Sequence, residues 1–245
     1  MLPTHATLLF AAAAALAIGC KTSADTASAA TTPPRSAVGT AASSAAAAGM
    51  PHDSLTDLAD RGRIRGSATA PLWLIVVSDF QCPYCKQWHD ETYPALDSEY
   101  VRTGKVRLAY LNLPLRMHPW AKPAAEAAMC ASVQGKFWPM QDALFATQQQ
   151  WEQTPDAPAR FDSLAAKSGL DMPRWRNCVA QHLTMPLIQA DADRASTAGV
   201  QSTPSFFIGD EAVEGAQPLA LFRQVIDRQL AKAASHSAAP APPAR

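Results

Sequence analysis

The sequence predicts an α/β fold in which a block of helices interrupts the strands. Residues 72–80 form an apolar run, rich in β-branched and aromatic side chains, that is typical of a buried strand and leads into a Cys-Pro-Tyr-Cys motif at residues 82–85. Residues 119–199 have helical periodicity and no strand pattern. Two short strands and an amphipathic helix are predicted between residues 203 and 232.

The elements follow in order along the chain. Trp88 and Leu96 lie at helical spacing from Cys85 and predict a helix that ends before Gly104. Residues 105–112 alternate apolar and polar side chains, as in a half-buried strand. Glycines and prolines then divide the helical block into segments at about 121–134, 136–149, 158–168, 173–183 and 185–198. The strand after Thr203-Pro204 is predicted to pair with residues 211–216, and a helix is predicted over 218–232.

The N-terminal region has the pattern of an export signal. Residues 8–18 are apolar but too few to span a bilayer comfortably, and Gly19-Cys20 follows them. This resembles the signal peptide of a bacterial lipoprotein, with a signal over residues 1–19 and lipidation at Cys20. The resemblance implies a membrane-anchored protein of the periplasm or cell envelope. An ordinary secretory signal with a soluble product is the alternative, because the n-region lacks Lys and Arg and Ala17 stands where Leu is commoner.

Composition sets the expected domain boundaries. Residues 20–50 are almost entirely Ala, Ser, Thr, Gly and Pro, so they cannot bury a core and are predicted to form a disordered linker. Residues 233–245 are predicted to form a disordered tail for the same reason, which leaves 51–232 as the folded domain. The formal net charge is zero and the basic residues are scattered, which argues against nucleic acid as a partner.

The cysteine motif predicts redox chemistry. Cys82 lies where the strand ends and the helix begins, and the free N–H groups and dipole of a helix N-terminus favour a thiolate. Cys82 is therefore the candidate nucleophile and Cys85 the candidate resolving thiol. Half of a zinc site is one alternative, although no second ligand pair has a suitable spacing. An inert structural disulfide is the other.

Counting cysteines constrains the disulfides. If Cys20 carries lipid, four cysteines remain, which is an even number in a compartment that permits disulfides. Three pairings are then open. The simplest joins Cys82 to Cys85 and Cys130 to Cys178, the latter as a structural disulfide. Two buried free thiols at 130 and 178 are the alternative.

The order of elements resembles the thioredoxin arrangement with a helical insertion at about 119–199. The motifs within 61–232 resemble those of exported thiol:disulfide interchange proteins of the DsbA type, in the branch that reads F-x-C-P-x-C. The segments that carry this resemblance are Asp79–Cys85, Leu113–Leu115 with His118-Pro119, Ala124–Cys130, Gly135–Trp138, Asp142–Phe145, Cys178 and Gly199–Gly209.

The resemblance implies an envelope enzyme that exchanges thiols and disulfides in exported proteins, together with an unidentified redox partner. It implies no cofactor and no metal. Cys82 would be the exposed nucleophile and Cys85 its buried partner. Thr203 and Pro204 would bind substrate, with Pro204 as a cis-proline beside the disulfide. We assign His118 no catalytic role and expect His89 to be solvated on its helix face.

One departure from the family bears on direction. Related domains usually carry a buried carboxylate six residues before the first active-site cysteine, where this chain has Val76. Strand alternation places Asp79 on the opposite face from residue 76, so Asp79 is a doubtful substitute. An oxidase is therefore favoured, with a reductase or an isomerase as alternatives. A non-catalytic binding or chaperone module and a glutathione-dependent isomerase on the same fold are the other hypotheses.

Overall fold

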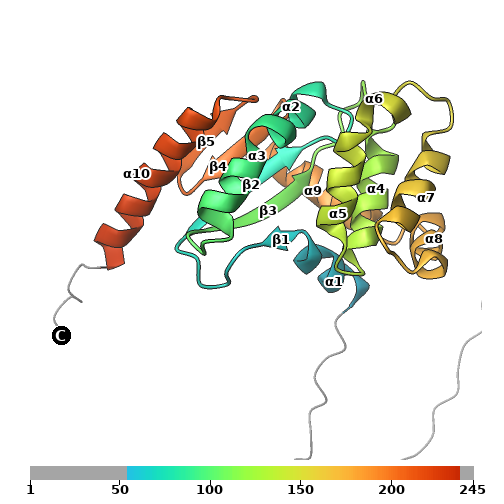
Figure 1. Ribbon diagram of the computed structural model, residues 1–245, viewed down its shortest axis with the longest axis horizontal. Helices are drawn as coiled ribbons and strands as arrows, with labels where there is room; N and C mark the ends of the chain where they lie inside the picture. The colour runs from blue at the N-terminus through green and yellow to red at the C-terminus, as the bar shows by residue number, and fades with distance from the viewer. Residues whose placement is uncertain (1–53, 238–245) are drawn as a thin grey trace, which may run out of the picture. The chain divides into compact units, whose positions relative to one another are not determined.

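A computed structural model describes residues 54–237 of the 245 (Figure 1). The predicted signal peptide, the lipidation of Cys20, the linker and the end of the tail lie outside the described residues. The elements are, in order, α1 (Leu55–Gly62), β1 (Ile64–Arg65), β2 (Leu72–Ser78), α2 (Pro83–Glu91), α3 (Tyr93–Leu96), the π-helical turn η1 (Asp97–Val101), β3 (Val106–Asn112), α4 (Ala121–Ser132), α5 (Phe137–Ala146), α6 (Gln148–Trp151), α7 (Ala157–Lys167), α8 (Met172–Ala180), α9 (Met185–Thr197), β4 (Ser205–Ile208), β5 (Glu211–Glu214) and α10 (Leu219–Ser237).

The strands form one mixed sheet in the order β1-β3-β2-β4-β5, which confirms the predicted α/β class. Strands β2 and β3 are parallel, and the other neighbours are antiparallel. In this register Val76 on the central strand lies opposite Tyr110 and Phe206. The carboxyl ends of β2 and β3 meet the start of β4 at one edge of the sheet, which is where open α/β sheets carry their sites.

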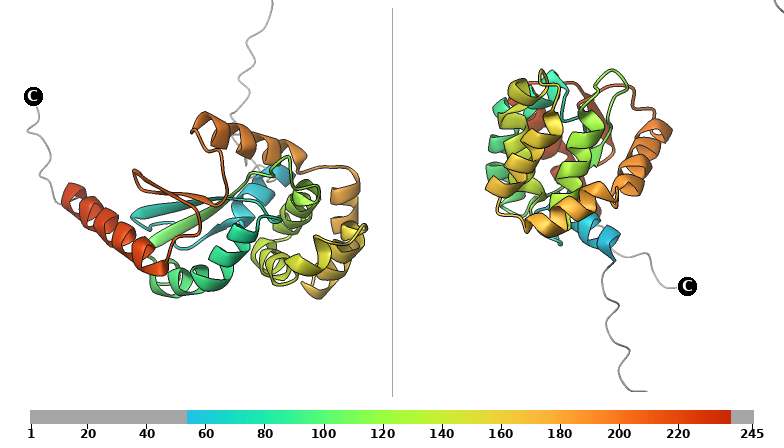
Figure 2. Two further views of the ribbon diagram at one scale, coloured as in Figure 1. Left: turned by 90° about the horizontal axis from the view of Figure 1, so that it is seen from above. Right: turned by 90° about the vertical axis from the view of Figure 1, so that its right-hand side faces the viewer.

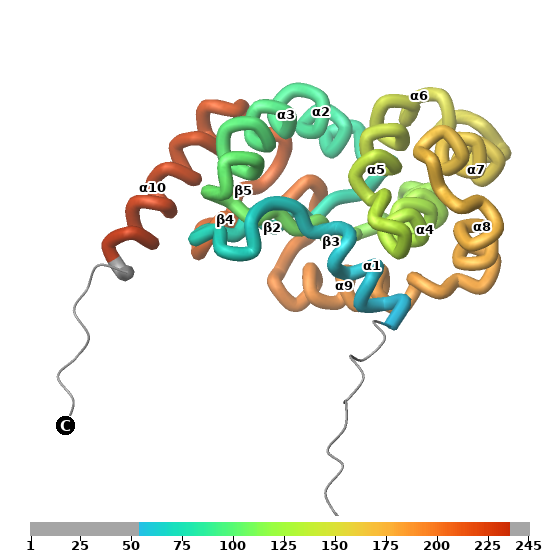
Figure 3. Tube along the Cα trace, turned by 60° about the horizontal axis from the view of Figure 1, so that its bottom comes forward, coloured from blue at the N-terminus to red at the C-terminus, as the bar shows by residue number. Residues whose placement is uncertain are grey.

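Helices cover both faces of the sheet. Figure 2 shows α9 on one face, with α2, α3 and α10 on the other. The helices α4 to α8 pack together at one end of the sheet, as Figure 3 shows from a different side. They form the predicted insertion between β3 and β4, and α9 leads the chain back to the sheet. No helix in the described part of the chain is both long and apolar enough to cross a bilayer.

Alternation explains how the sheet joins these layers. Along β3, Val106, Leu108 and Tyr110 are buried and the residues between them are half-buried, as the sequence pattern predicts. On β2, Leu74, Val76 and Val77 are all buried, because helices cover both faces of the central strand.

Three helices differ in extent from the sequence prediction. The helix predicted after Cys85 is divided into α2, α3 and η1, because Pro94 has no N–H to continue the helical bonding. The predicted helix over 136–149 is divided into α5 and α6 at Thr147. Helix α10 continues to Ser237, five residues into the predicted tail, and two of those five residues are Ala, the strongest helix former.

The sequence prediction missed the first helix and the first strand. Helix α1 begins with a capping box: the Ser54 hydroxyl accepts from the Asp57 amide, and the Asp57 carboxylate accepts from the Ser54 amide. Strand β1 has only two residues and pairs with β3 at the sheet edge. So short a strand has no readable alternation, because the side-chain period of a strand is itself two residues.

Candidate active site

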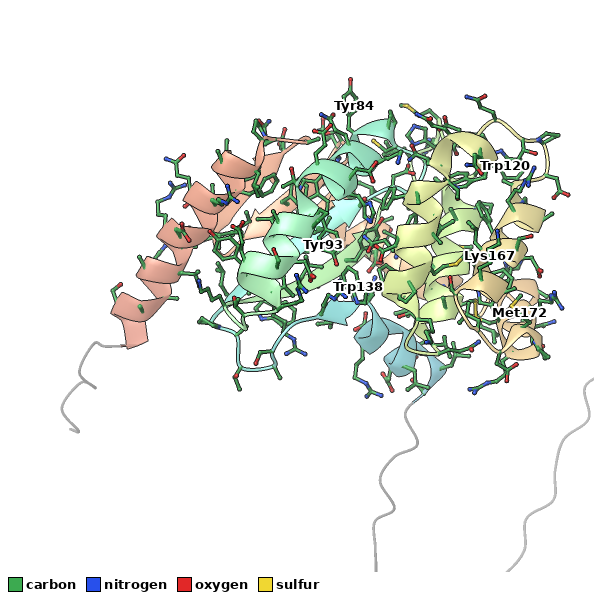
Figure 4. The ribbon with its side chains drawn as sticks, in the orientation of Figure 1. Tyr84, Tyr93, Trp120, Trp138, Lys167 and Met172 are labelled. Atoms are coloured by element: carbon green, nitrogen blue, oxygen red, sulfur yellow. A yellow bond between two sulfur atoms is a disulfide. The ribbon has the colours of Figure 1, made fainter. Side chains whose placement is uncertain are left out.

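The Cys-Pro-Tyr-Cys motif lies at the junction of β2 and α2. Cys82 is the N-cap residue of α2, and Pro83 occupies the first turn, where its missing N–H costs nothing. Tyr84 is 62% exposed and points outward from the start of α2 (Figure 4). Cys85 is fully buried on the opposite side of the same turn. Two thiols with very different surroundings therefore lie within one helical turn.

Cys82 is an acidic thiol in this structure. The hydrogen bond from Cys85, followed by those from Thr203 and the Cys85 and Tyr84 amides, outweighs burial and lowers the pKa of Cys82 to about 6. In the protonated form Cys82 Sγ lies 3.3 Å from the Thr203 carbonyl oxygen, to which it donates. The Thr203 hydroxyl oxygen is buried and has no other hydrogen-bond partner among the described residues, so its proton is available to the thiolate.

The prediction that Cys82 is exposed is wrong for this structure. Only 4% of the residue is accessible, because the Thr203-Pro204 loop lies against its sulfur. The sequence pattern placed the cysteine correctly at the helix start, but it carried no information on what covers it.

Cys85 has the opposite character. Burial is the largest cause that raises its pKa well above the usual range, and the hydrogen bond and charge of Cys82 raise it further. The Ser78 side chain and the Asp79 amide oppose this by hydrogen bonding, with the amide nitrogen 3.5 Å from Cys85 Sγ. Cys85 therefore keeps its proton when Cys82 has lost its own.

The Thr203–Pro204 peptide bond is cis and faces the cysteine pair. Pro204 immediately precedes β4, whose first residue, Ser205, pairs with Val77 of β2. The Pro204 carbonyl accepts from the Gly215 amide at 2.8 Å, so β5 holds the loop from behind. The two residues that the resemblance implied for substrate binding thus lie beside Cys82, with Thr203 in direct contact.

Groups from the connection between β3 and α4 and from α6 hold the loop between β2 and α2. The Asp79 carboxylate is fully buried, accepts from the Leu115 amide at 2.8 Å and pairs with His118 Nδ1 at 2.7 Å. Gln148 Nε2 donates to the carbonyl oxygens of Phe80 and Cys82, at 2.7 and 3.0 Å. The backbone just before Cys82 is therefore fixed from two directions.

Two of these contacts add to the sequence prediction. His118, to which we assigned no catalytic role, holds the loop before Cys82 through Asp79. Its presence in the quoted His-Pro motif was the one available signal. Gln148 lies in a helix with no motif at all.

The prediction that His89 is solvated is wrong. Its side chain lies between Asp90 and Asp142 and packs on Phe145, because α5 covers this face of α2.

A family model described as thioredoxin matches residues 59–228. The chain belongs to the thioredoxin family.

This family member is similar to curated proteins of two kinds, antiporters and a disulfide bond formation protein. The Na(+)/H(+) antiporter NhaA 3 of Salinispora tropica is 36% identical over 157 residues, which are 64% of this chain and 23% of the antiporter. Probable disulfide bond formation protein D of Bacillus anthracis is 26% identical over 170 residues, which are 68% of this chain and 77% of that protein. The chain thus spans about a quarter of the length of the antiporters that it matches.

Solved structures confirm the thioredoxin-like fold with its insertion. Alpha-DsbA1 of Wolbachia pipientis superposes with a TM-score of 0.64 at 24% identity, covering 71% of this chain and 93% of that one. Oxidised BdbD from Bacillus subtilis gives the same TM-score at 20% identity, with 70% and 94% covered. The family resemblance therefore predicted the fold correctly.

A disulfide joins the other two cysteines of this thioredoxin-family domain. Cys130 on α4 and Cys178 on α8 are both buried, with their Cα atoms 5.8 Å apart. This bond lies within the helical insertion and leaves Cys82 and Cys85 as the free cysteines of the described chain. No group of three or more His, Cys, Asp or Glu side chains that could hold a metal ion occurs within residues 54–237.

The acidity of Cys82 predicts a pH dependence. We expect the alkylation rate of the reduced protein to be half-maximal near pH 6. The ultraviolet absorbance of the Cys82 thiolate should rise with the same midpoint. The Cys85→Ser variant should titrate at higher pH, because Cys85 is the largest cause of the lowered pKa of Cys82. Reduced protein should also become more stable as pH rises from about 6 towards 9, where the unfolded thiol still holds its proton and the folded thiol does not. A midpoint near 9 in both proteins would contradict the assignment.

Proposed function

We propose that this thioredoxin-family protein is a thiol:disulfide oxidoreductase that acts on cysteines of other proteins. One observation carries the proposal: an acidic thiol, Cys82, and a thiol that retains its proton, Cys85, lie in one turn beside the cis Thr203–Pro204 bond. Cys82 is the catalytic nucleophile and Cys85 the resolving thiol. The printed name of the Bacillus anthracis relative supports the same class of activity.

In the oxidising direction, the protein starts with a Cys82–Cys85 disulfide. A client thiolate attacks Cys82 Sγ, the Cys82–Cys85 bond breaks, and Cys85 leaves and takes a proton. A second client thiolate then attacks the client sulfur of the mixed disulfide, and Cys82 leaves as a thiolate. Two electrons pass from the client to the pair, which a disulfide-bearing redox partner must later accept. The low pKa of Cys82 favours this second step, because a more acidic thiol leaves faster.

The client reaches Cys82 as an extended chain along the Thr203-Pro204 loop. An extended segment can pair with the exposed backbone of a sheet edge or loop, which holds its cysteine at a fixed distance from the enzyme's sulfur. Thr203 is the contact residue in this arrangement, since its carbonyl already lies 3.3 Å from Cys82 Sγ. Pro204 shapes the loop and is fixed at the start of β4.

A direct assay tests the proposal. Oxidised full-length protein should convert a reduced two-cysteine peptide to its disulfide in stoichiometric amounts, and catalytically when an external oxidant is supplied. The redox state of Cys82 and Cys85 in cells that make the protein, measured by alkylation and gel shift, then gives the direction. A mostly oxidised pair means an oxidase, and a mostly reduced pair means a reductase. No peptide oxidation and no disulfide reduction by the pure protein would reject the proposal.

The surroundings of Cys85 favour the oxidising direction. Reducing a client requires Cys85 to lose its proton and attack, and a nearby carboxylate can accept that proton. Here the group that bonds to Cys85 from β2 is the Ser78 side chain, and Val76 lies on the same strand face. The Asp79 carboxylate is occupied by Leu115 and His118. Forming a client disulfide does not require attack by Cys85. The lack of a free carboxylate near Cys85 should therefore slow oxidation of a client less than reduction.

Restoring the carboxylate should therefore accelerate reduction. We expect Val76→Glu to speed insulin reduction near neutral pH by about tenfold, below the roughly 100-fold of a well-placed general base, and to change oxidative turnover much less. The matched control is Val77→Glu, which buries the same group on the opposite face of the strand at a similar cost in stability. Equal effects of Val76→Glu on both directions, or equal effects of the two variants, would contradict the carboxylate argument.

We further propose that the protein acts in the cell envelope, anchored to a membrane through lipid on Cys20. The short apolar segment and Gly19-Cys20 support this proposal, as does the Ala- and Ser-rich stretch that follows. Detergent partitioning tests it: wild type should enter the detergent phase, and Cys20→Ser should remain in the aqueous phase. Its clients would then be exported proteins that carry cysteine thiols or disulfides.

A further inference from the structure

A groove of about 400 Å³ lies between the loop that follows β3 and helix α9. Residues 113–115 form one wall, and Met185, Ile188 and Ala192 of α9 contribute to the other. Its volume is in the range of pockets that hold a small ligand or a few side chains. We call it the β3–α9 groove. It belongs to neither the cysteine pair nor the disulfide of the insertion.

The walls of the groove are fixed relative to each other. Asp191 of α9 is fully buried and accepts from the backbone amide and the side-chain amide of Asn112, at 3.0 and 3.1 Å. It also forms a buried ion pair with Arg63. These bonds hold α9 against the end of β3, directly before the loop that forms the facing wall. The groove is therefore already formed before anything binds.

The groove is continuous with the active-site loops at two points. The Leu115 amide, in one wall, donates to the Asp79 carboxylate at 2.8 Å. Gln201 lines the groove and lies two residues before Thr203, which contacts Cys82. A chain that passes the Thr203-Pro204 loop next to Cys82 therefore reaches the groove within a few residues.

The groove carries positive charge that nothing in it neutralises. Arg116 and Lys122 line it, both are exposed, and no Asp or Glu side chain lines it. Neither cation forms an ion pair with another described residue. On the α2 side of the active site the charges are paired instead, as in the bond between Lys86 and Asp90. The groove thus combines apolar side chains with two cations, and its complement is a segment with apolar and acidic side chains.

We propose that the β3–α9 groove binds the client segment next to its reacting cysteine and selects for Asp or Glu in that segment. This inference rests on the proposed oxidoreductase function and adds the chemistry of the client. Because exposed ion pairs are individually weak, two of them predict a preference of about fivefold in kcat/KM for an acidic over a basic segment at low salt. The preference should shrink at high salt, where exposed charges are screened.

Three reduced peptides test the proposal with the full-length, oxidised protein. They share two cysteines and an apolar residue and differ only in carrying two Glu, two Gln or two Lys beside the first cysteine. We expect kcat/KM to fall in the order Glu, Gln, Lys. The double variant Arg116→Glu with Lys122→Glu should reverse that order.

The matched control is Arg160→Glu with Lys167→Glu, which changes net charge equally with two exposed residues of α7 that do not line the groove. It should retain the wild-type order. The thermal unfolding temperature of each variant checks that it is folded. Equal kcat/KM for the three peptides, or an unchanged order in the groove variant, would overturn the inference. If no peptide is oxidised at all, the proposed function itself fails, so the two failures are distinguishable.

Discussion

Replacing Cys82 by Ser should abolish both oxidation of a client peptide and reduction of insulin. A serine hydroxyl is far less acidic than this thiol, whose pKa is lowered to about 6, and it cannot form a disulfide. We expect turnover to fall by roughly 10³-fold or more, the scale seen when an enzyme loses its nucleophile. The measurement is kcat/KM in both directions against the wild type.

The matched variant is Cys85→Ser, which keeps the proposed nucleophile, Cys82, and removes only the proposed resolving thiol. Its Cys82 should still attack a client disulfide, but the mixed disulfide cannot resolve through residue 85. A covalent adduct should therefore accumulate on non-reducing gels and disappear with reductant. If adducts formed in Cys82→Ser and were absent from Cys85→Ser, the two cysteines would have the opposite roles. Such a result would contradict the opposite pKa shifts of Cys82 and Cys85 described above.

The position of the cysteine pair could be predicted from sequence because it depends on local pattern. An apolar run of strand length, a Cys-x-x-Cys motif and apolar residues at helical spacing place Cys82 at a helix N-terminus, where the structure has it. The alternation of residues 105–112 predicted β3 in the same way. In both cases the determining residues are neighbours in the sequence.

Local pattern could not predict the environment of the pair, because that environment depends on residues distant in the sequence; the family resemblance alone implied that Thr203 and Pro204 lie beside it. Thr203 covers Cys82 across 121 positions, and Gln148 bonds to the Cys82 carbonyl across 66. His118 reaches Asp79 across 39. No periodicity links such residues, so a single sequence predicts that a nucleophile is present but not how closely it is enclosed. The break in the helix after Cys85 has a different cause, because Pro94 is visible in the sequence. The helix prediction followed the spacing of the apolar residues instead.

The positive charge of the β3–α9 groove could be predicted only in part from the sequence. Arg116 and Lys122 flank a short segment, and their proximity in the sequence is plain. Their common orientation toward α9 depends on the fold, because α9 begins more than 60 residues later and is held at β3 by Asp191. The sequence alone therefore indicates scattered basic residues and a net charge of zero, whereas in the structure two of these residues line one groove.

Loss of the Cys130–Cys178 disulfide should lower stability without altering the chemistry of Cys82. The bond closes a loop of 48 residues, so the chain-entropy model predicts that it contributes about 4 kcal/mol to the free energy of unfolding. The bond joins α4 to α8 inside the insertion, whereas Cys82 lies at the start of α2. The double variant Cys130→Ala with Cys178→Ala should thus unfold at lower denaturant concentration. At a temperature where it is folded, it should oxidise peptide at the wild-type rate.

Substitution alone confounds two effects, because Ala at these buried positions also removes two packed sulfur atoms. The effects separate in a background that carries Cys82→Ala and Cys85→Ala, where an added reductant acts on the insertion disulfide and on no other bond of the described domain. Reduction in that background leaves the sulfur atoms in place and should by itself lower the free energy of unfolding by about 4 kcal/mol. The further loss in the double Ala variant measures packing. Equal denaturation midpoints with and without reductant would show that α4 and α8 are held together by their side-chain contacts, with the covalent bond contributing nothing to stability.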